Sequence, residues 1–109
     1  MSSDLINLDE LKNLYGEASV RELLEMSLGE ARGLVNELKA KIPARNSGAV
    51  SADAHQLKGM AATMTMNRLA ELAHKLELCS KSQSWEECDT LLLSVDTCFA
   101  ELEAFLKKV

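Results

Sequence analysis

Apolar residues recur every three or four positions along most of this chain, and a single proline, Pro43, interrupts the pattern. Such spacing places apolar side chains along one face of a helix. The longest run extends from about Ala18 to Ile42, and Pro43 closes it because the residue before a proline avoids the α region. No segment alternates apolar and polar residues as a strand would. The pattern therefore predicts an all-α protein.

Capping and turn residues on both sides of this run predict further helices. Asn7 and Gly16 are expected to begin and end a short first helix. After a loop at 43–48, Gly48 or Ser51 leads into a helix that runs to about Met64.

Two more helices are expected in the second half of the chain. Thr65 or Asn67 is expected to cap the first of them, which ends in the polar run 81–84. Ser84 and Glu87 form an S-x-x-E capping box, which predicts a last helix that reaches Leu106. Four long helices with short connections predict one domain over residues 1–109, an antiparallel up-down-up-down four-helix bundle with a short extra N-terminal helix.

The charge balance of the chain excludes some partners. Its 109 residues carry a net charge of −5, and nucleic-acid binding needs a basic face. No run approaches the roughly 20 apolar residues of a membrane span, and the N-terminus at 1–4 lacks the basic and apolar regions of a secretion signal. These features predict a cytoplasmic protein that binds neither nucleic acid nor membrane.

The cysteines also favour a cytoplasmic protein. Cys79, Cys88 and Cys98 are odd in number and include no C-x-x-C pair. A disulfide framework would use an even count, so we expect buried free thiols in a reducing compartment.

His55 is the candidate functional residue. It lies one step from an apolar helical stripe, so its ring should sit at the edge of the core and face outward. Its neighbours on that face are mostly small: Ser51, Ala52, Lys58, Gly59 and Ala62. Glycine inside a helix costs about 1 kcal/mol relative to alanine, and room above the His55 ring would explain Gly59. We therefore expect a face cleared for a partner.

The chemistry of this face favours an anionic group on the imidazole. A neutral imidazole nitrogen is a nucleophile at physiological pH. Lys58, one turn along the helix, would place an ammonium beside a group attached to His55. Phosphoryl is the obvious candidate.

The segment Ala54–Gly59 closely resembles the His-x-Leu-Lys-Gly signature of histidine-containing phosphotransfer (HPt) domains. The resemblance extends from about Leu8 to Leu106 and includes the run at 68–73. The chain differs from the family pattern at Met60, where a small residue is usual, and at Thr65, where glycine is usual. The first difference bears on partner preference and the second on the turn after the His55 helix.

The resemblance implies a function for each of these residues. Nε2 of His55 would accept a phosphoryl group from one receiver aspartate and pass it to another, with Mg²⁺ in the receiver and no cofactor in this chain. Lys58 would offset the phosphoryl charge, Gln56 would hydrogen-bond at the rim, and Gly59 would clear the approach. The implied partners of this monomer are response-regulator receiver domains and a hybrid histidine kinase. They would dock on Ser51, Ala52, Met60 and Ala62 and on an adjoining part of the 18–42 helix.

Other interpretations remain open from the residues alone. A non-catalytic adaptor would use the same face without phosphorylation, and a metal or redox protein would use the cysteines. A kinase is disfavoured because the chain has no glycine-rich phosphate loop. His74, beside Lys75 and Glu77, is expected on an ordinary solvated surface, and no metal site is expected.

In the longest helix, the remaining polar and small residues leave two interpretations. Gly29 and Gly33 indicate either close helix packing or a low surface beside His55. Glu30 and Arg32 are expected to be solvated.

Overall fold

The computed structural model describes residues 5–109, and the predictions made for residues 1–4 lie outside it. Within that range every regular element is helical, as the apolar spacing predicts. The elements are α1 (Leu8–Tyr15), the short 3-10 helix η2 (Glu17–Ser19), α2 (Val20–Lys41), α3 (Ser47–Thr63), α4 (Asn67–Lys81) and α5 (Trp85–Leu106). No helix in the described range is both long enough and apolar enough to cross a membrane.

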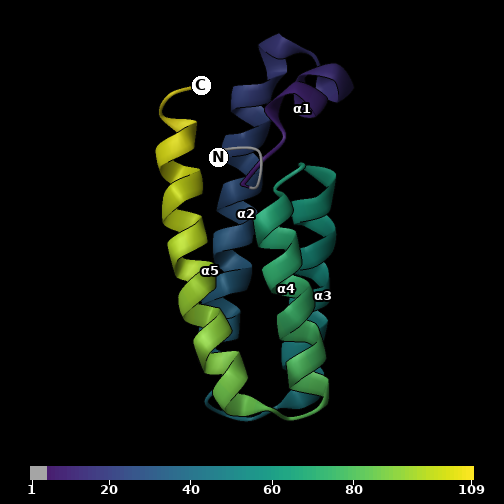
Figure 1. Cartoon of the computed structure of the whole chain (residues 1–109), viewed down its shortest axis with the longest axis vertical. Coiled ribbons are helices and arrows are strands. Elements are labelled where there is room, and N and C mark those ends of the chain that lie inside the picture. Colours follow the sequence, from purple (N-terminus) through teal and green to yellow (C-terminus); the bar gives the residue numbers. More distant parts are fainter. Residues whose placement is uncertain (1–4) are drawn as a thin grey trace.

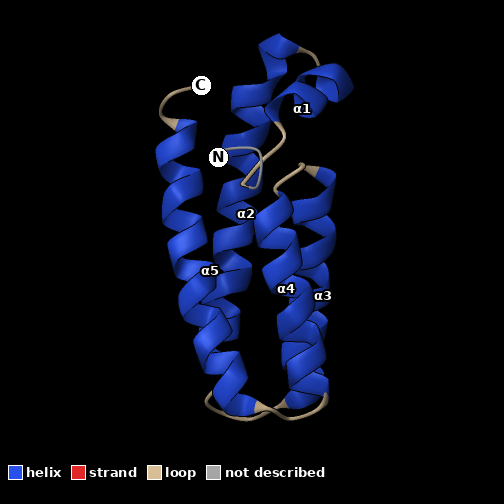
Figure 2. Ribbon diagram, in the orientation of Figure 1, coloured by secondary structure: helices blue, strands red, loops and turns tan. Residues whose placement is uncertain are grey.

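The four long helices, α2 to α5, lie side by side, and consecutive helices are joined at alternate ends (Figure 1). The short helix α1 lies across the end where α3 passes into α4, and Figure 2 shows only helices and loops. The molecule measures 42 × 23 × 18 Å along its principal axes. This arrangement leaves one long side of α3 beside α4 and another beside α2.

The apolar stripes of the four long helices meet in one core. The largest side chains that are fully buried there come from every long helix: Leu24, Leu38, Leu57, Leu69, Leu76 and Leu102. Removing such side chains from water contributes about 1.5–3 kcal/mol each. Leucine therefore stabilises a core in which the chain has few aromatic residues to use.

The first two predicted helix starts have different outcomes. Asn7 caps α1 as expected, because its side chain accepts a hydrogen bond from the Glu10 amide at 3.0 Å. The prediction of Gly48 or Ser51 for α3 is wrong. Asn46 caps this helix through a 3.1 Å hydrogen bond from the Ala49 amide.

The predicted side-chain caps of the last two helices are also wrong. Met66, and neither Thr65 nor Asn67, occupies the capping position of α4. Ser84 does occupy the predicted capping position of α5, but its side chain makes no capping hydrogen bond. Thr65 has instead a left-handed backbone, with φ of 56°, and its hydroxyl donates to the Asn7 carbonyl at 2.8 Å. A β-branched residue is strained in that region, and this bond ties the turn to the chain before α1. Thr65 thus keeps the bend where the family usually has glycine.

Two expectations for α2 also change. A Cβ atom on Gly29 or Gly33 would meet no described atom within 4 Å, so close helix packing does not explain these glycines. Arg32 is not simply solvated, because it pairs with Glu103 of α5 and lies 4.8 Å from the centre of the Phe99 ring. Its half-exposed side chain therefore connects α2 to α5.

Candidate functional site

His55 lies on the outer side of α3, as its position beside the buried stripe predicts. Ala54 and Leu57 on the same helix are fully buried, whereas the His55 side chain is 67% exposed. An imidazole with that exposure can be reached by another protein. The prediction of an accessible ring is therefore confirmed.

The other predicted site residues share this helix but differ in exposure. The exposed ones are Ala52, Gln56, Gly59 and Ala62, and the half-buried ones are Ser51, Lys58 and Met60. A Cβ atom on Gly59 would meet no described atom within 4 Å, so no contact within the described chain requires glycine there. Met60 packs against the hydrophobic core and is half-buried, so only part of its side chain is available to a partner.

A carboxylate that the sequence interpretation missed lies beside His55. Nδ1 of His55 is 3.2 Å from Oε2 and 3.4 Å from Oε1 of Glu77, a residue of α4. The Glu77 side chain is only 10% exposed, so it does not belong to the solvated surface expected around His74. The two helices thus bring together residues that are 22 positions apart.

Two lysines complete the surroundings of Glu77. Lys58 Nζ lies 3.1 Å from Oε1, and Lys81 Nζ lies 3.3 Å from Oε2. Lys58 is on α3, one turn after His55, and Lys81 is on α4, one turn after Glu77. The carboxylate therefore has one donor from its own helix and two from α3.

These contacts determine the charge of Glu77. Burial raises the pKa of its carboxyl group, but hydrogen bonds from Lys58, Lys81 and His55 outweigh burial and lower that pKa from 4.5 to about 2. The side chain is therefore ionised at neutral pH. Two ammonium groups make a nearly buried carboxylate tolerable, because a buried charge is costly unless it is paired.

The ionised carboxylate fixes the proton on the imidazole. A carboxylate can only accept hydrogen bonds, so Nδ1 of His55 must carry the proton that it donates to Glu77. In the neutral ring the lone pair is then on Nε2. A partner carboxylate that fixes the tautomer and orientation of a histidine is a common device in sites where histidine reacts.

The sequence did hold a signal for Glu77. Counted along α4, it falls four residues after Ala73 and three before Ser80, and both of these are fully buried. A glutamate at the edge of a buried stripe is unusual unless it has a partner. The sequence interpretation instead took Glu77, together with Lys75, as part of an ordinary solvated surface around His74.

The remaining polar candidates do not join the site. His74 is exposed on α4, as expected. Cys79, Cys88 and Cys98 are free and buried, which confirms the predicted burial of these thiols. Among residues 5–109, no group of three or more His, Cys, Asp or Glu side chains could hold a metal ion.

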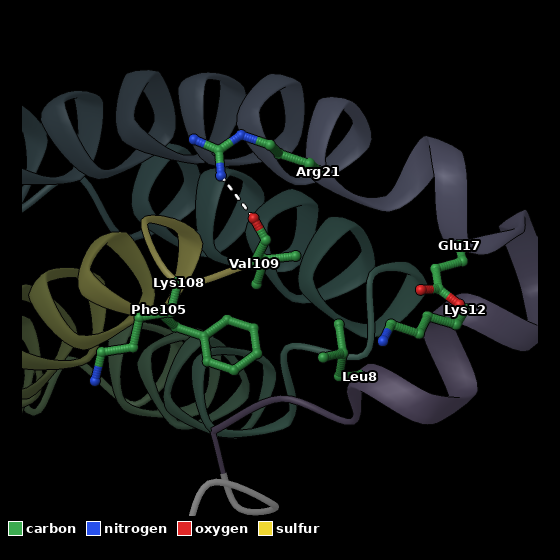
Figure 3. A pocket seen from close by; sticks show the side chains of 7 residues that line it. All are labelled: Leu8, Lys12, Glu17, Arg21, Phe105, Lys108 and Val109. Carbon is green, nitrogen blue, oxygen red and sulfur yellow. Dashed lines mark hydrogen bonds between the residues drawn. The ribbon is translucent and has the colours of Figure 1, made fainter.

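A hollow of about 380 Å³ lies elsewhere, at the end of the molecule that carries α1. Figure 3 shows the Phe105 and Leu8 side chains beside it, and the Arg21 guanidinium donates to the Val109 carbonyl oxygen at 2.8 Å. Its lining comes from α1, η2, α2 and the C-terminal part of the chain, and none of it from α3. The candidate site is thus an exposed imidazole on α3, and the residues that line this hollow do not belong to it.

A comparison with known protein families identifies the family of this chain. The family model of the Hpt domain matches residues 22–105. The chain belongs to the Hpt domain family. This confirms the resemblance seen around His55 and makes histidine phosphotransfer in two-component signalling the class of function of this Hpt domain.

A solved structure has the same fold as this Hpt domain. It is the crystal structure of histidine-containing phosphotransfer protein B (HptB) from Pseudomonas aeruginosa PAO1, with a TM-score of 0.86 and 20% sequence identity. The match covers 95% of this chain and 92% of that one. No curated protein sequence gives a match.

Proposed function

We propose that this Hpt domain relays phosphoryl groups between receiver aspartates by carrying them on Nε2 of His55. One observation carries the proposal: an exposed imidazole has its other nitrogen bound to an ionised, nearly buried carboxylate at 3.2 Å. The up-down-up-down antiparallel arrangement of α2 to α5 within a single domain is the scaffold. It holds α3 and α4 side by side and so holds both groups in place.

The transfer step follows from this geometry. The Nε2 lone pair attacks the phosphorus of a receiver aspartyl phosphate, the N–P bond forms, and the P–O bond to the aspartate breaks. The leaving group is the receiver carboxylate, and the proton on Nδ1 stays in place. The ring therefore gains positive charge, which Glu77 stabilises across its 3.2 Å hydrogen bond. The reverse reaction with a second receiver returns the ring to its neutral form.

Lys58 has a second role in this proposal. One turn along α3 from His55, it is near enough to leave Glu77 and pair with a phosphoryl group on Nε2. Lys81 and His55 would still hold the Glu77 carboxylate after that exchange. The pair of lysines thus allows one cation to follow the phosphoryl group without leaving a buried charge unpaired.

The low outer face of α3 is the proposed docking surface for the receiver. Ala52, Gly59 and Ala62 present no bulky side chain, so a partner's acidic pocket can approach the ring closely. Gln56, also exposed, is placed to hydrogen-bond at the rim. The half-buried Ser51 and an adjoining part of α2 extend this surface, while Met60 contributes through its exposed edge. The Mg²⁺ for the step would be held by the receiver, and this chain would act as a cytoplasmic monomer that takes its phosphoryl group from a hybrid kinase.

Phosphoryl transfer from a purified, phosphorylated receiver tests the proposal. Wild-type protein should gain acid-labile, base-stable label, whereas His55→Gln should gain none. His74→Gln is the matched control, because His74 is the other histidine of the chain and is exposed on the neighbouring helix. It should be labelled like wild type.

The same experiment separates a relay from an adaptor. A receiver that binds wild type and His55→Gln equally, with neither protein labelled, would replace the relay by a docking function. Label on His55→Gln would show that another residue is the acceptor. Circular dichroism of each variant confirms that a missing label reflects lost chemistry and not a lost fold.

A further inference from the structure

Two of the three cysteines meet across the hairpin that joins α4 to α5. The Sγ atoms of Cys79 and Cys88 are 2.8 Å apart, and both side chains are buried. Cys79 lies in the last turn of α4 and Cys88 in the first turn of α5. Cys98, in contrast, lies ten residues further along α5, about 15 Å away along the helix axis.

We propose that Cys79 and Cys88 form an oxidative modification site, in which a hydroperoxide converts the two facing thiols into a disulfide that joins α4 to α5. The two sulfurs have to close by less than about 1 Å to reach a disulfide bond length of about 2 Å. Two thiols this close, at the end of α4 and the start of α5, are within reach of each other in the folded protein. This site involves neither His55 nor a phosphoryl group, so it stands apart from the relay.

The reaction balances with a hydroperoxide as the oxidant. One thiolate attacks the peroxide, becomes a sulfenic acid and releases hydroxide, or alkoxide from an organic hydroperoxide. The second sulfur then attacks the sulfenic sulfur, the S–S bond forms, and water leaves. With hydrogen peroxide, two thiols and one peroxide give one disulfide and two water molecules.

The surroundings of the pair make this oxidation slow, and its selectivity comes from the 2.8 Å approach of the two sulfurs. Burial raises the pKa of Cys79 to about 12 and also raises that of Cys88, so little thiolate is present at neutral pH. The turn at 82–84, in which Ser82 and Gln83 are exposed, adjoins both cysteines. The ends of helices open locally at lower cost than a helix interior. An oxidant therefore reaches this pair without unfolding the whole molecule.

The disulfide would lie next to the candidate site. Glu77 and Lys81 each lie two positions from Cys79 on α4, so the bond would fix the turn of α4 that carries both. A disulfide between Cys79 and Cys88 would close a loop of about ten residues and so reduce the conformational entropy of the unfolded chain. We expect the oxidised protein to melt roughly 10 °C above the reduced one.

The test is mild treatment of the native full-length protein with hydrogen peroxide, followed by a thiol count under denaturing conditions and peptide mapping. The expected result is the loss of two of the three thiols and two hydrogen atoms from the intact mass, with Cys79 and Cys88 in one linked peptide. Cys98 serves as an internal control, because it is also buried and its pKa is also raised, to about 11. It should remain a thiol.

Two cysteine variants test the linkage separately from the wild-type peptide map. Cys98→Ser should still form the linkage and show the higher melting temperature, whereas Cys88→Ser should not. If Cys88→Ser fails to fold, the peptide map of wild type still decides the matter. Equal loss of Cys98, linkage between molecules, or sulfinic acid in place of the disulfide would overturn the proposal.

Discussion

Two of the ion pairs that connect neighbouring helices, one between α2 and α5 and one between α3 and α4, differ in burial. Between α2 and α5, Lys39 pairs with Asp96 at 2.9 Å, and each side chain is nearly half exposed. Between α3 and α4, the partner of Lys58 is Glu77, whose side chain is only 10% exposed. Both contacts have ordinary salt-bridge geometry, and only the second includes a carboxylate withdrawn from water.

This difference determines what each contact can do. Water and salt screen an exposed pair, which contributes about 0–1 kcal/mol. A nearly buried carboxylate keeps its charge only through its partners, so its position and ionisation depend on them. The α2–α5 pairs are therefore surface contacts, whereas Glu77 is a fixed negative charge directed at the His55 ring.

The largest expected effect comes from neutralising one carboxylate of each helix pair, Glu77 between α3 and α4 and Glu103 between α2 and α5. Glu77→Gln should slow phosphoryl transfer from a phosphorylated receiver about tenfold, because the positive charge that develops on the ring loses its counter-charge. Glu103→Gln removes the partner of Arg32 on α5 and should leave the rate unchanged. Rapid-quench measurement of labelled protein gives both rates.

A rate for Glu77→Gln equal to wild type would mean that a neutral hydrogen-bond acceptor is sufficient at Nδ1. Equal losses in the two variants would mean that the whole surface charge matters and that burial does not distinguish the two sides. Comparing Glu77→Ala with Glu77→Gln separates loss of the hydrogen bond from loss of the charge.

The pH dependence of stability provides a second test of the buried charge on Glu77. Because the pKa of Glu77 falls from 4.5 to about 2 on folding, its ionisation stabilises the fold above pH 4.5, and this contribution is lost as the pH falls toward 2. The stability gap between wild type and Glu77→Gln should therefore narrow over that interval, by on the order of 2 kcal/mol. Urea unfolding at several pH values measures it, and a gap that stays constant would contradict the lowered pKa.

A smaller effect is expected from the exposed lysine of the site. Lys81→Met should slow transfer only about twofold to threefold, because His55 still pairs with Glu77 when Lys58 moves to the phosphoryl group and because the Lys81 side chain is 60% exposed. Lys39→Met on the other side should have no effect on transfer. A loss with Lys81→Met as large as with Glu77→Gln would show that the carboxylate depends on both lysines at once.

The helices could be predicted from the sequence because apolar spacing repeats over many residues and depends little on distant contacts. Their starts were harder, since several polar residues near each one can serve as the cap. Asn46 took the cap expected of Gly48 or Ser51, and Thr65 used its hydroxyl to bind the Asn7 carbonyl. These choices depend on which chain segments meet in space.

The residues of the candidate site also differ in how well the sequence predicts them. His55, Lys58 and Gly59 lie within five residues of one another, so their signature is readable along one helix. Glu77 comes from another helix, and its contact depends on the register between α3 and α4, which local spacing does not specify. The accessible histidine could therefore be predicted, whereas the sequence indicated only that Glu77 has a partner and not that this partner is His55.

The smallest effect is expected for the exposed ion pair between α2 and α5. A double-mutant cycle with Lys39→Met and Asp96→Asn should give a coupling of roughly 0.5 kcal/mol or less in urea unfolding, falling further in high salt. Both side chains are nearly half exposed, so water replaces each partner at little cost when the other is removed. A coupling well above 1 kcal/mol would show that exposed pairs also hold these helices together, and burial would then no longer explain why Glu77 differs from them.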